Sequence, residues 1–216
     1  MCGGPRSDKP LRVINNEAIV ARTIRLLHEN GITDIAISTN DDRYQGIAPI
    51  LHHDNSLTWD GFYWLNGFYP MTDPVCYIFG DVFFSPEAIK TITHKDTEGI
   101  EFFASAPPFD ARYQKRWAEP FAFKVHDTAA FFKAIARCKE LDAEHKFNRP
   151  PISWELWQVI KGTALNKPDY TNYTAINDYT VDIDDDEQKY DKSDIDILIG
   201  FYFFCTYFCQ NKTLHT

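Results

Sequence analysis

The stretch VCYIFGDVFF, residues 75–84, is an apolar run that is interrupted only by Gly80 and Asp81. Valine, isoleucine and aromatic residues at this density predict a buried β-strand. We expect the strand to end at Gly80 and Asp81, which leaves the carboxylate of Asp81 at the edge of a sheet. A carboxylate in that place is well positioned to hold a cation. The structural alternative is an aspartate that caps the following turn, and the run alone leaves both interpretations open.

Segments with the patterns of helices and strands alternate on both sides of this run. Asn16, Ser85 and Asp127 are expected to cap helices, and Gly31 is expected to end the first one. Such alternation indicates an α/β fold with a mostly parallel sheet, in which ligands bind at the carboxyl ends of the strands. The expected helices are 16–31, 85–94, 127–143 and 153–162, and the expected strands are 32–39, 47–53, 75–81, 100–108, 120–127 and 172–184.

A second acidic feature lies in TVDIDDDEQ, residues 180–188. Asp182 and Asp184 alternate with apolar residues, so both carboxylates face one side of a strand while the apolar side chains face the other. Two carboxylates on one face repel each other unless a cation lies near them. Because no histidine or cysteine is close in sequence, these carboxylates and Asp81 indicate a hard cation such as Mg²⁺. The later acidic residues of the run are expected to form a solvated helix start.

The amino-terminal stretch CGGPRSDKPL, residues 2–11, combines small residues with cations. Gly3 and Gly4 allow backbone N–H groups to approach a phosphate closely, and Arg6 and Lys9 follow with positive charge. The pattern is neither a P-loop nor a G-x-G-x-x-G fingerprint. It suits a phosphate-rich ligand whose remaining charge is balanced by Mg²⁺.

Composition limits the class of protein. The chain has 216 residues, of which 44% are hydrophobic and 25% charged, as in a globular protein with a packed core. Its net charge of −9 disfavours a general nucleic-acid surface, which needs a basic face. Five cysteines without a zinc-binding spacing, and no signal peptide, predict a cytoplasmic protein. The longest apolar run, residues 197–209, is shorter than the roughly 20 residues that span a bilayer.

Four stretches, taken in order, resemble the nucleotidyltransferase superfamily: CGGPRSDKPL, GITDIAISTN, YIFGDVFF and YTVDIDDDEQ. This superfamily includes sugar-phosphate nucleotidyltransferases, cytidylyltransferases and MobA-like enzymes. The resemblance implies a three-layer α/β/α domain of the glycosyltransferase-A type, with a mostly parallel sheet, over residues 1–190. An atypical apolar tail, residues 191–216, would follow it.

The resemblance also implies how the site is divided. A glycine loop would wrap the triphosphate, two cations would steady its charge, carboxylates would hold Mg²⁺, and a strand end would lie near the base and ribose. These roles would fall to Gly3 and Gly4 for the loop, Arg6 and Lys9 for the charge, Asp81 with Asp184 or else Asp182 for the metal, and Ser38 and Asn40 for the base and ribose.

The reaction implied by the resemblance is Mg²⁺-dependent transfer of a nucleoside monophosphate, with CMP or UMP favoured. The acceptor would be a phosphorylated sugar or small alcohol for surface-polysaccharide synthesis, and pyrophosphate would leave. Two alternatives remain open: a nucleotide-binding module of the same fold without turnover, and a glycosyltransferase that uses Asp-Ile-Asp at 182–184. Release of pyrophosphate rather than of a nucleoside diphosphate would distinguish the two enzymes.

The chain departs from the family at both ends. The hydrophobic strand that feeds the glycine loop is almost entirely absent, and the loop between Arg6 and Lys9 is short. A missing central strand would leave its neighbours unpaired. At the other end, residues 197–209 are apolar on every face. The tail is expected to form a homodimer interface, to pair as a strand, to lie on a membrane surface or to be non-native sequence, and the sequence leaves these alternatives open.

Overall fold

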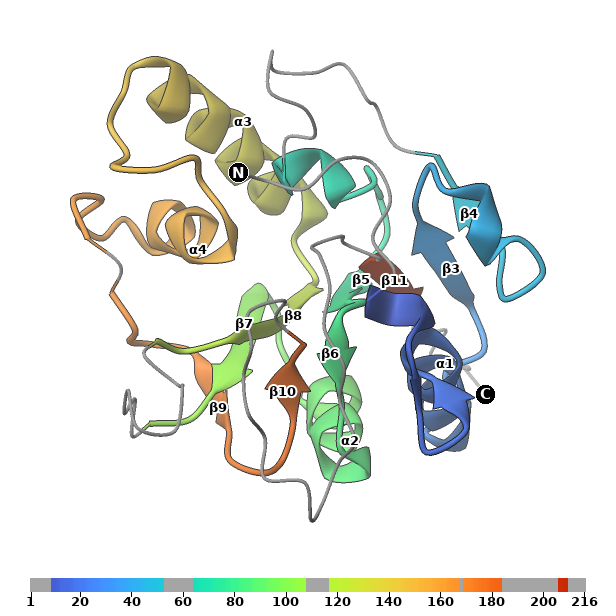
Figure 1. The fold of residues 1–216 in the computed structure, drawn as a ribbon. Helices are drawn as coiled ribbons and strands as arrows, with labels where there is room; N and C mark the ends of the chain where they lie inside the picture. Colours follow the sequence, from blue (N-terminus) through green and yellow to red (C-terminus); the bar gives the residue numbers. More distant parts are fainter. Residues whose placement is uncertain (1–8, 53–63, 108–116, 168, 184–205, 210–216) are drawn as a thin grey trace.

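The structure is a computed structural model that describes residues 9–52, 64–107, 117–167 and 169–183, together with the backbone of 206–209 (Figure 1). It has mixed α/β content. No helix in the described part of the chain is long and apolar enough to cross a membrane. The helices are α1 (Ile19–Glu29), α2 (Pro86–His94), α3 (Thr128–Ala143) and α4 (Ser153–Lys161), and short 3₁₀ turns are η1 (Lys9–Leu11), η2 (Asp42–Tyr44) and η3 (Trp64–Gly67).

Seven strands form the main sheet, in the order β4-β3-β11-β5-β8-β7-β9. Two further pairs, β1–β2 and β6–β10, are small separate sheets. The strands are β1 (Val13–Ile14), β2 (Glu17–Ala18), β3 (Ile35–Ser38), β4 (Ile50–Leu51), β5 (Val75–Phe79), β6 (Val82–Phe83), β7 (Ile100–Ser105), β8 (Pro120–Val125), β9 (Thr174–Ile176), β10 (Val181–Asp182) and β11 (Thr206–Cys209).

The main sheet is mixed, which corrects the expectation of a mostly parallel sheet. Five of its strands run in one direction, whereas β8 and β11 run in the other. Consequently only β3–β4 and β7–β9 are parallel pairs, and the other four pairs are antiparallel. The reason is the path of the chain: β8 is the next described element after β7 and returns directly beside it, which reverses its direction.

Capping residues explain where three of the helices begin or end. Ser85 accepts a hydrogen bond from the backbone N–H of Ala88 (2.9 Å), and Asp127 accepts one from Ala130 (2.9 Å), so both predicted caps are confirmed. Gly31 follows α1 with φ of 80°, a conformation that glycine adopts without strain.

The expected cap at Asn16 is wrong. Helix α1 begins at Ile19, and Ala18 precedes it without a side-chain cap. Asn15 and Asn16 both have positive φ values, 51° and 64°, between the paired strands β1 and β2. Asparagine tolerates the left-handed conformation that a two-residue hairpin turn requires. A hairpin therefore takes the place of the first turn of the expected helix.

Helices lie on two sides of the strands in Figure 1, with α3 and α4 together in the upper part and α1 and α2 together in the lower part. The helices of each pair also contact each other. The largest cluster of buried residues spans the main sheet and these helices, and it is rich in aromatic rings. Phe123 of β8 lies at the centre of that group. Its ring centroid lies 4.4–6.4 Å from those of Phe68, Phe79, Phe102, Phe131 and Trp157.

Replacing Phe123 with alanine should lower the free energy of unfolding by about 3–5 kcal/mol, because it leaves a cavity where five rings now pack. Urea unfolding followed by circular dichroism measures the change. Trp117→Ala is the matched control, since Trp117 is 46% exposed and its removal should cost less than about 0.5 kcal/mol. Equal losses in the two variants would contradict this description of the core.

Two cysteines in the core should be chemically inert. Burial raises the pKa of the Cys76 thiol to about 12, and burial together with Glu155 raises that of Cys138 to about 12. Only the thiolate reacts readily with iodoacetamide. At pH 8 both residues should stay unmodified in the folded protein and become alkylated in denaturant, as peptide mass spectrometry would show. Alkylation of either residue at the same rate in both conditions would contradict the burial.

Candidate functional site

Asp81 lies at the carboxyl end of β5, where the sequence predicted it. The residue is 4% exposed, and its backbone carbonyl accepts a hydrogen bond from the N–H of Ile183 (2.9 Å). Strand β6 follows at once and pairs with β10, so that the Cα of Asp182 lies opposite that of Val82. The structure therefore brings Asp81 and Asp182 together, although about 100 residues separate them in the chain.

Glu119 is a third carboxylate at this place, and the sequence analysis missed it. The residue is 6% exposed, and its Oε2 accepts a hydrogen bond from the backbone N–H of Asp182 (3.3 Å). The backbone of Glu119 is held by Ser105, whose N–H donates to the Glu119 carbonyl (2.8 Å) and whose Oγ accepts from the Glu119 N–H (2.9 Å). Glu119 directly precedes β8.

The only signal for Glu119 in the sequence was an acidic residue just before a predicted strand. Because β8 runs against β5 and β7, its beginning lies at the same edge of the sheet as their carboxyl ends. A search restricted to the carboxyl ends of parallel strands could not find it. The reversal of β8 is what adds Glu119 to the site.

Lys9, one of the two predicted catalytic cations, is fully buried in η1. Lysine is rarely buried completely, because its ammonium group must exchange water for other compensating interactions. The burial of Lys9 therefore excludes a solvated surface position for this side chain.

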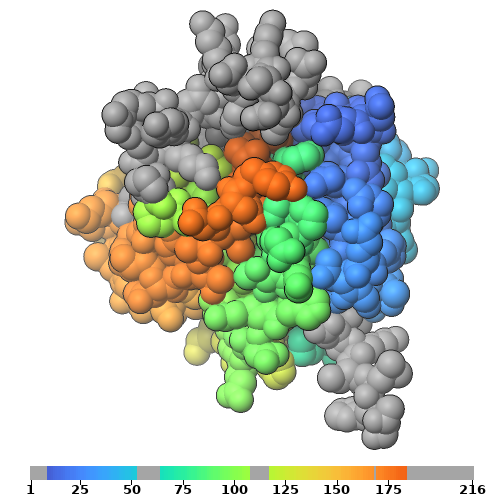
Figure 2. Space-filling model, turned by 90° about the horizontal axis from the view of Figure 1, so that it is seen from below, coloured from blue at the N-terminus to red at the C-terminus, as the bar shows by residue number. Residues whose placement is uncertain are grey.

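A small apolar cluster ties the amino-terminal segment to the two carboxylate strands. It contains Ile14, Ile19, Phe83, Val181 and Ile183. In Figure 2 the blue residues of the amino-terminal segment and α1, the green residues after β5 and the orange residues of the β9–β10 region meet on one face of the molecule. The amino-terminal segment and the two segments that carry Asp81 and Asp182 therefore contribute to one apolar cluster.

Arg22 of α1 strengthens this attachment. Its guanidinium group lies 4.6 Å from the centroid of the Phe83 ring, and its Nε and one terminal nitrogen donate to the carbonyl of Phe84 (3.3 Å each). A cation over an aromatic face is attracted by the ring quadrupole. This contact holds α1 against the chain that follows Asp81.

Strand β10 is anchored from its other end by Ser85, the cap of α2. The Ser85 hydroxyl donates to Oδ2 of Asp178 (2.6 Å), and the Ser85 N–H donates to the hydroxyl of Thr180 (3.0 Å). Asp178 also accepts from the N–H of Thr180 (2.8 Å). These bonds hold the turn that leads into β10, and so they position Asp182.

Ser38 and Asn40, the residues predicted near the base and ribose, lie at the carboxyl end of β3. Ser38 is fully buried and its hydroxyl donates to the carbonyl of Gly67 (2.9 Å), so this hydroxyl contributes to the core. Asn40 is exposed, and its Oδ1 lies 3.3 Å from Nδ1 of His52. Of the two, Asn40 has the side chain that a ligand could reach.

The remaining predicted site residues, Gly3, Gly4, Arg6 and Asp184, lie outside the described residues. Within the described part of the chain, no group of three or more His, Cys, Asp and Glu side chains is arranged to hold a metal ion. Mg²⁺ commonly takes only one or two protein carboxylates and completes its shell with water and phosphate oxygens. Asp81 and Asp182 are carboxylate residues of that type and number, and they lie on adjacent backbone segments.

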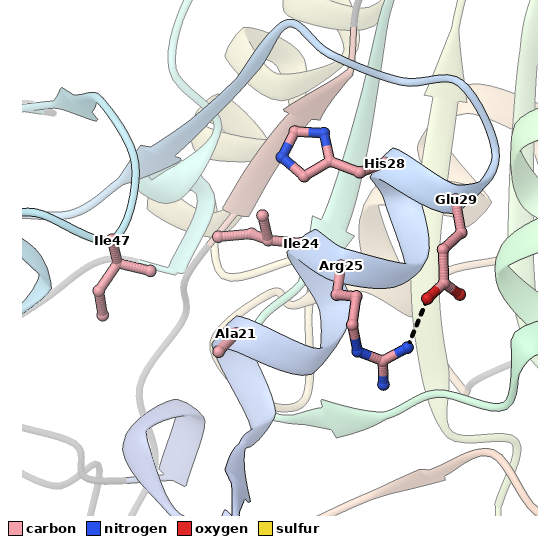
Figure 3. A pocket seen from close by; sticks show the side chains of 6 residues that line it. All are labelled: Ala21, Ile24, Arg25, His28, Glu29 and Ile47. Atoms are coloured by element: carbon pink, nitrogen blue, oxygen red, sulfur yellow. Dashed lines mark hydrogen bonds and ion pairs between the residues drawn. The ribbon is translucent and has the colours of Figure 1, made fainter.

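A separate hollow lies beside α1, and neither Asp81 nor Asp182 is among its lining residues (Figure 3). It has a volume of about 670 Å³. Arg25 donates a hydrogen bond to Glu29 (2.7 Å) and two more to Glu17 (2.8 Å each). The lining residues are Ala21, Ile24, Arg25, His28, Glu29 and Ile47. None of the predicted site residues belongs to this hollow.

Comparison with known proteins adds no further assignment. No protein-family model, no curated protein and no solved structure matches the chain.

Ser85 and Asp178 should be energetically coupled if they position β10 as described. Ser85→Ala should cost about 0.5–2 kcal/mol as the loss of a helix cap. Combined with Asp178→Asn, the cycle should give a coupling energy of about 0.5–3 kcal/mol in urea unfolding. Ser85→Ala combined with Asp127→Asn, the cap of α3, is the control and should be additive. Additivity in both cycles would show that Ser85 acts only as a cap.

Proposed function

We propose that the protein is a Mg²⁺-dependent nucleotidyltransferase that moves a nucleoside monophosphate from its triphosphate to a phosphorylated small molecule and releases pyrophosphate. One observation carries the proposal. The β6–β10 pair holds the backbone segments that carry Asp81 and Asp182 side by side, and the hydrogen bond from the Ile183 N–H to the Asp81 carbonyl joins the two segments. Aspartates on adjacent backbone segments at the carboxyl edge of an α/β sheet are candidates for a site that binds a nucleotide with a metal ion.

The fold that we propose for this function is the three-layer α/β/α arrangement of the glycosyltransferase-A type. The separation of the α1–α2 pair from the α3–α4 pair in Figure 1 supports it. The position of Asp81 two residues after the end of a fully buried strand supports it as well. In this arrangement the nucleotide would lie across the edge formed by the ends of β3 and β5.

The residues would divide the work as follows. Asp81 and Asp182, with Asp184, would hold Mg²⁺, which when bound supplies positive charge that neutralises phosphate oxygens. Lys9 and Arg6 would stabilise the negative charge that develops on the triphosphate as pyrophosphate leaves. Backbone N–H groups of Gly3 and Gly4 would cradle the phosphates.

Binding at this edge would orient the two substrates rather than activate a protein nucleophile. An oxygen of the acceptor phosphate attacks the α-phosphorus, and the bond from that phosphorus to the bridging oxygen of pyrophosphate breaks. Such chemistry depends mainly on positioning and electrostatic stabilisation. Asn40, the exposed residue beyond β3, would contact the base or ribose, and CTP or UTP is the favoured donor. A phosphorylated sugar or small alcohol is the favoured acceptor.

Thermal-shift measurements with CTP, UTP, GTP and ATP, each with and without Mg²⁺, test the proposal. One triphosphate at about 100 times its Kd should stabilise the protein by about 2.7 kcal/mol. For a chain of this size that corresponds to a rise in Tm of about 5–10 °C. The rise should require Mg²⁺. No rise with any triphosphate, on a protein shown to be folded, would refute the proposal.

Turnover is tested by pyrophosphate release with two matched pairs of variants. Asp81→Asn and Lys9→Met should each lower kcat/KM by on the order of 100-fold or more. Asp34→Asn is the control for the carboxylate, since Asp34 is exposed and precedes β3 at the opposite edge of the sheet. Lys90→Met, at an exposed position of α2, is the control for the lysine. Circular dichroism verifies that each variant is folded.

The same assays separate the two alternatives. A nucleotide that binds with Mg²⁺ and is never turned over would indicate a binding module. Release of a nucleoside diphosphate from a nucleotide-sugar would indicate a glycosyltransferase.

A further inference from the structure

Strands β3 and β5, which lead to Asn40 and Asp81, are not paired with each other. Strand β11 lies between them and is antiparallel to both (Figure 1). Along β3 it pairs over its full length, from Thr206 opposite Ser38 to Cys209 opposite Ile35. On its other side Thr206 and Tyr207 lie opposite Phe79 and Ile78 of β5. A segment from the far end of the chain is therefore a central strand of the main sheet.

The buried backbone of β3 and β5 needs hydrogen-bond partners at this position. Ile37 of β3 and Ile78 and Phe79 of β5 are fully or almost fully buried. Backbone N–H and C=O groups at such positions need partners within the protein, because water cannot reach them. Neighbouring strands lie about 4.8 Å apart, so one strand fills the space between β3 and β5 and satisfies both.

The residue types of the segment suit this task. Thr206, Tyr207 and Phe208 belong to the β-branched and aromatic classes that favour strands. A strand that is buried on both faces of a sheet has a continuous apolar sequence, whereas a half-exposed strand alternates apolar and polar residues. The proposed chemistry does not use the apolar run at 197–209. The pairing of β11 explains why the last four residues of this run have the composition of a strand.

Residues 206–209 occupy the space between β3 and β5. We propose that this inserted strand joins the two halves of the nucleotide site, so that binding of a nucleotide depends on it. The β4–β3 half carries Asn40, and the β5–β8–β7–β9 half carries Asp81. Within the described sheet, β11 is the strand that links these halves. The effect on nucleotide binding rests on the proposed function, whereas the strand insertion does not.

The strand of the same chain is favoured over one from a second copy. The 22 residues between Ile183 and Thr206 can span on the order of 70 Å when extended, which is ample for a domain of this size. A tethered segment acts at an effective concentration in the millimolar range. A strand from a second molecule at micromolar concentration cannot compete with it.

A disulfide to the natural Cys209 tests the insertion directly in the full-length protein. Residues directly opposite in antiparallel strands have Cα atoms about 4.5–5.5 Å apart, which lies within the range for a disulfide. Ile35→Cys places a thiol opposite Cys209. Under mild oxidation the variant should form this bond within one chain, seen by peptide mass spectrometry and by non-reducing electrophoresis as a monomer.

Ala36→Cys is the matched control. Position 36 lies opposite Phe208, so its side chain is offset by one residue and faces the other side of the sheet from that of position 35. It should form no bond with Cys209. Should Ile35→Cys fail to fold, Ser38→Cys with Thr206→Cys tests the same register at the other end of the strand with smaller changes in side-chain volume.

The outcomes are distinct. A bond within one chain, specific for position 35, establishes the insertion. A bond found only between two chains overturns the assignment to the same chain and shows that the strand is exchanged in a dimer. Absence of the bond in folded Ile35→Cys and in the second pair, or equal bonding at positions 35 and 36, overturns the insertion itself.

The link between the two halves is tested with Tyr207→Pro, because proline cannot maintain the ladder of a central strand. Thr213→Pro, beyond the strand, is the control. The variant Tyr207→Pro should lose the Mg²⁺-dependent thermal shift, and the control should retain it. An unchanged shift in Tyr207→Pro would refute the link. If the disulfide forms but the wild-type protein binds no triphosphate, the proposed function fails and the strand insertion stands.

Discussion

The need to pair every backbone group of a buried strand is the constraint on which the rest of this structure depends. All five residues of β5 are buried, so each N–H and C=O must find a partner inside the protein. β8 pairs along one side, from Val75 to Ile78, and β11 pairs at Ile78 and Phe79 on the other. Because β8 holds β5 as far as Ile78 and β11 holds it as far as Phe79, the turn at Gly80 places Asp81 at a defined point of the sheet edge.

The candidate site is assembled by long-range contacts around that point. The N–H of Ile183 bonds to the carbonyl of Asp81, and Glu119 bonds to the N–H of Asp182 across 63 residues of sequence. Asp81, Glu119 and Lys9 are buried charged residues. Charges in a region with little water interact more strongly than charges at the surface, and they must be balanced there. These buried charges are the reason why a nucleotide with its metal ion is proposed as the ligand, and the loss of a single charge should have a strong effect on such a site.

Local patterns predicted most of the elements near this edge. Ser85 and Asp127 cap α2 and α3 as expected, and Gly31 follows α1 in the left-handed conformation. Such features depend on residues within one helical turn of each other, so they can be recognised in the sequence. The prediction failed where two local preferences competed. Asn16 could have capped a helix, but with Asn15 it forms the turn of a hairpin, because asparagine also tolerates positive φ.

The sequence by itself determined the approximate places of helices α1–α4 and of the strands β3, β4, β5, β7 and β8, the position of Asp81 near a strand end and the acidic character of the chain around Asp182. Only the tertiary structure decided that β8 and β11 run against their neighbours, that Glu119 joins the two aspartates and that Lys9 is buried. The physical reason is the range of the interactions. Helix caps and strand patterns arise between residues a few positions apart, whereas the pairing of β5 with β11 and the approach of β10 to Asp81 join segments about 100 residues or more apart in the chain.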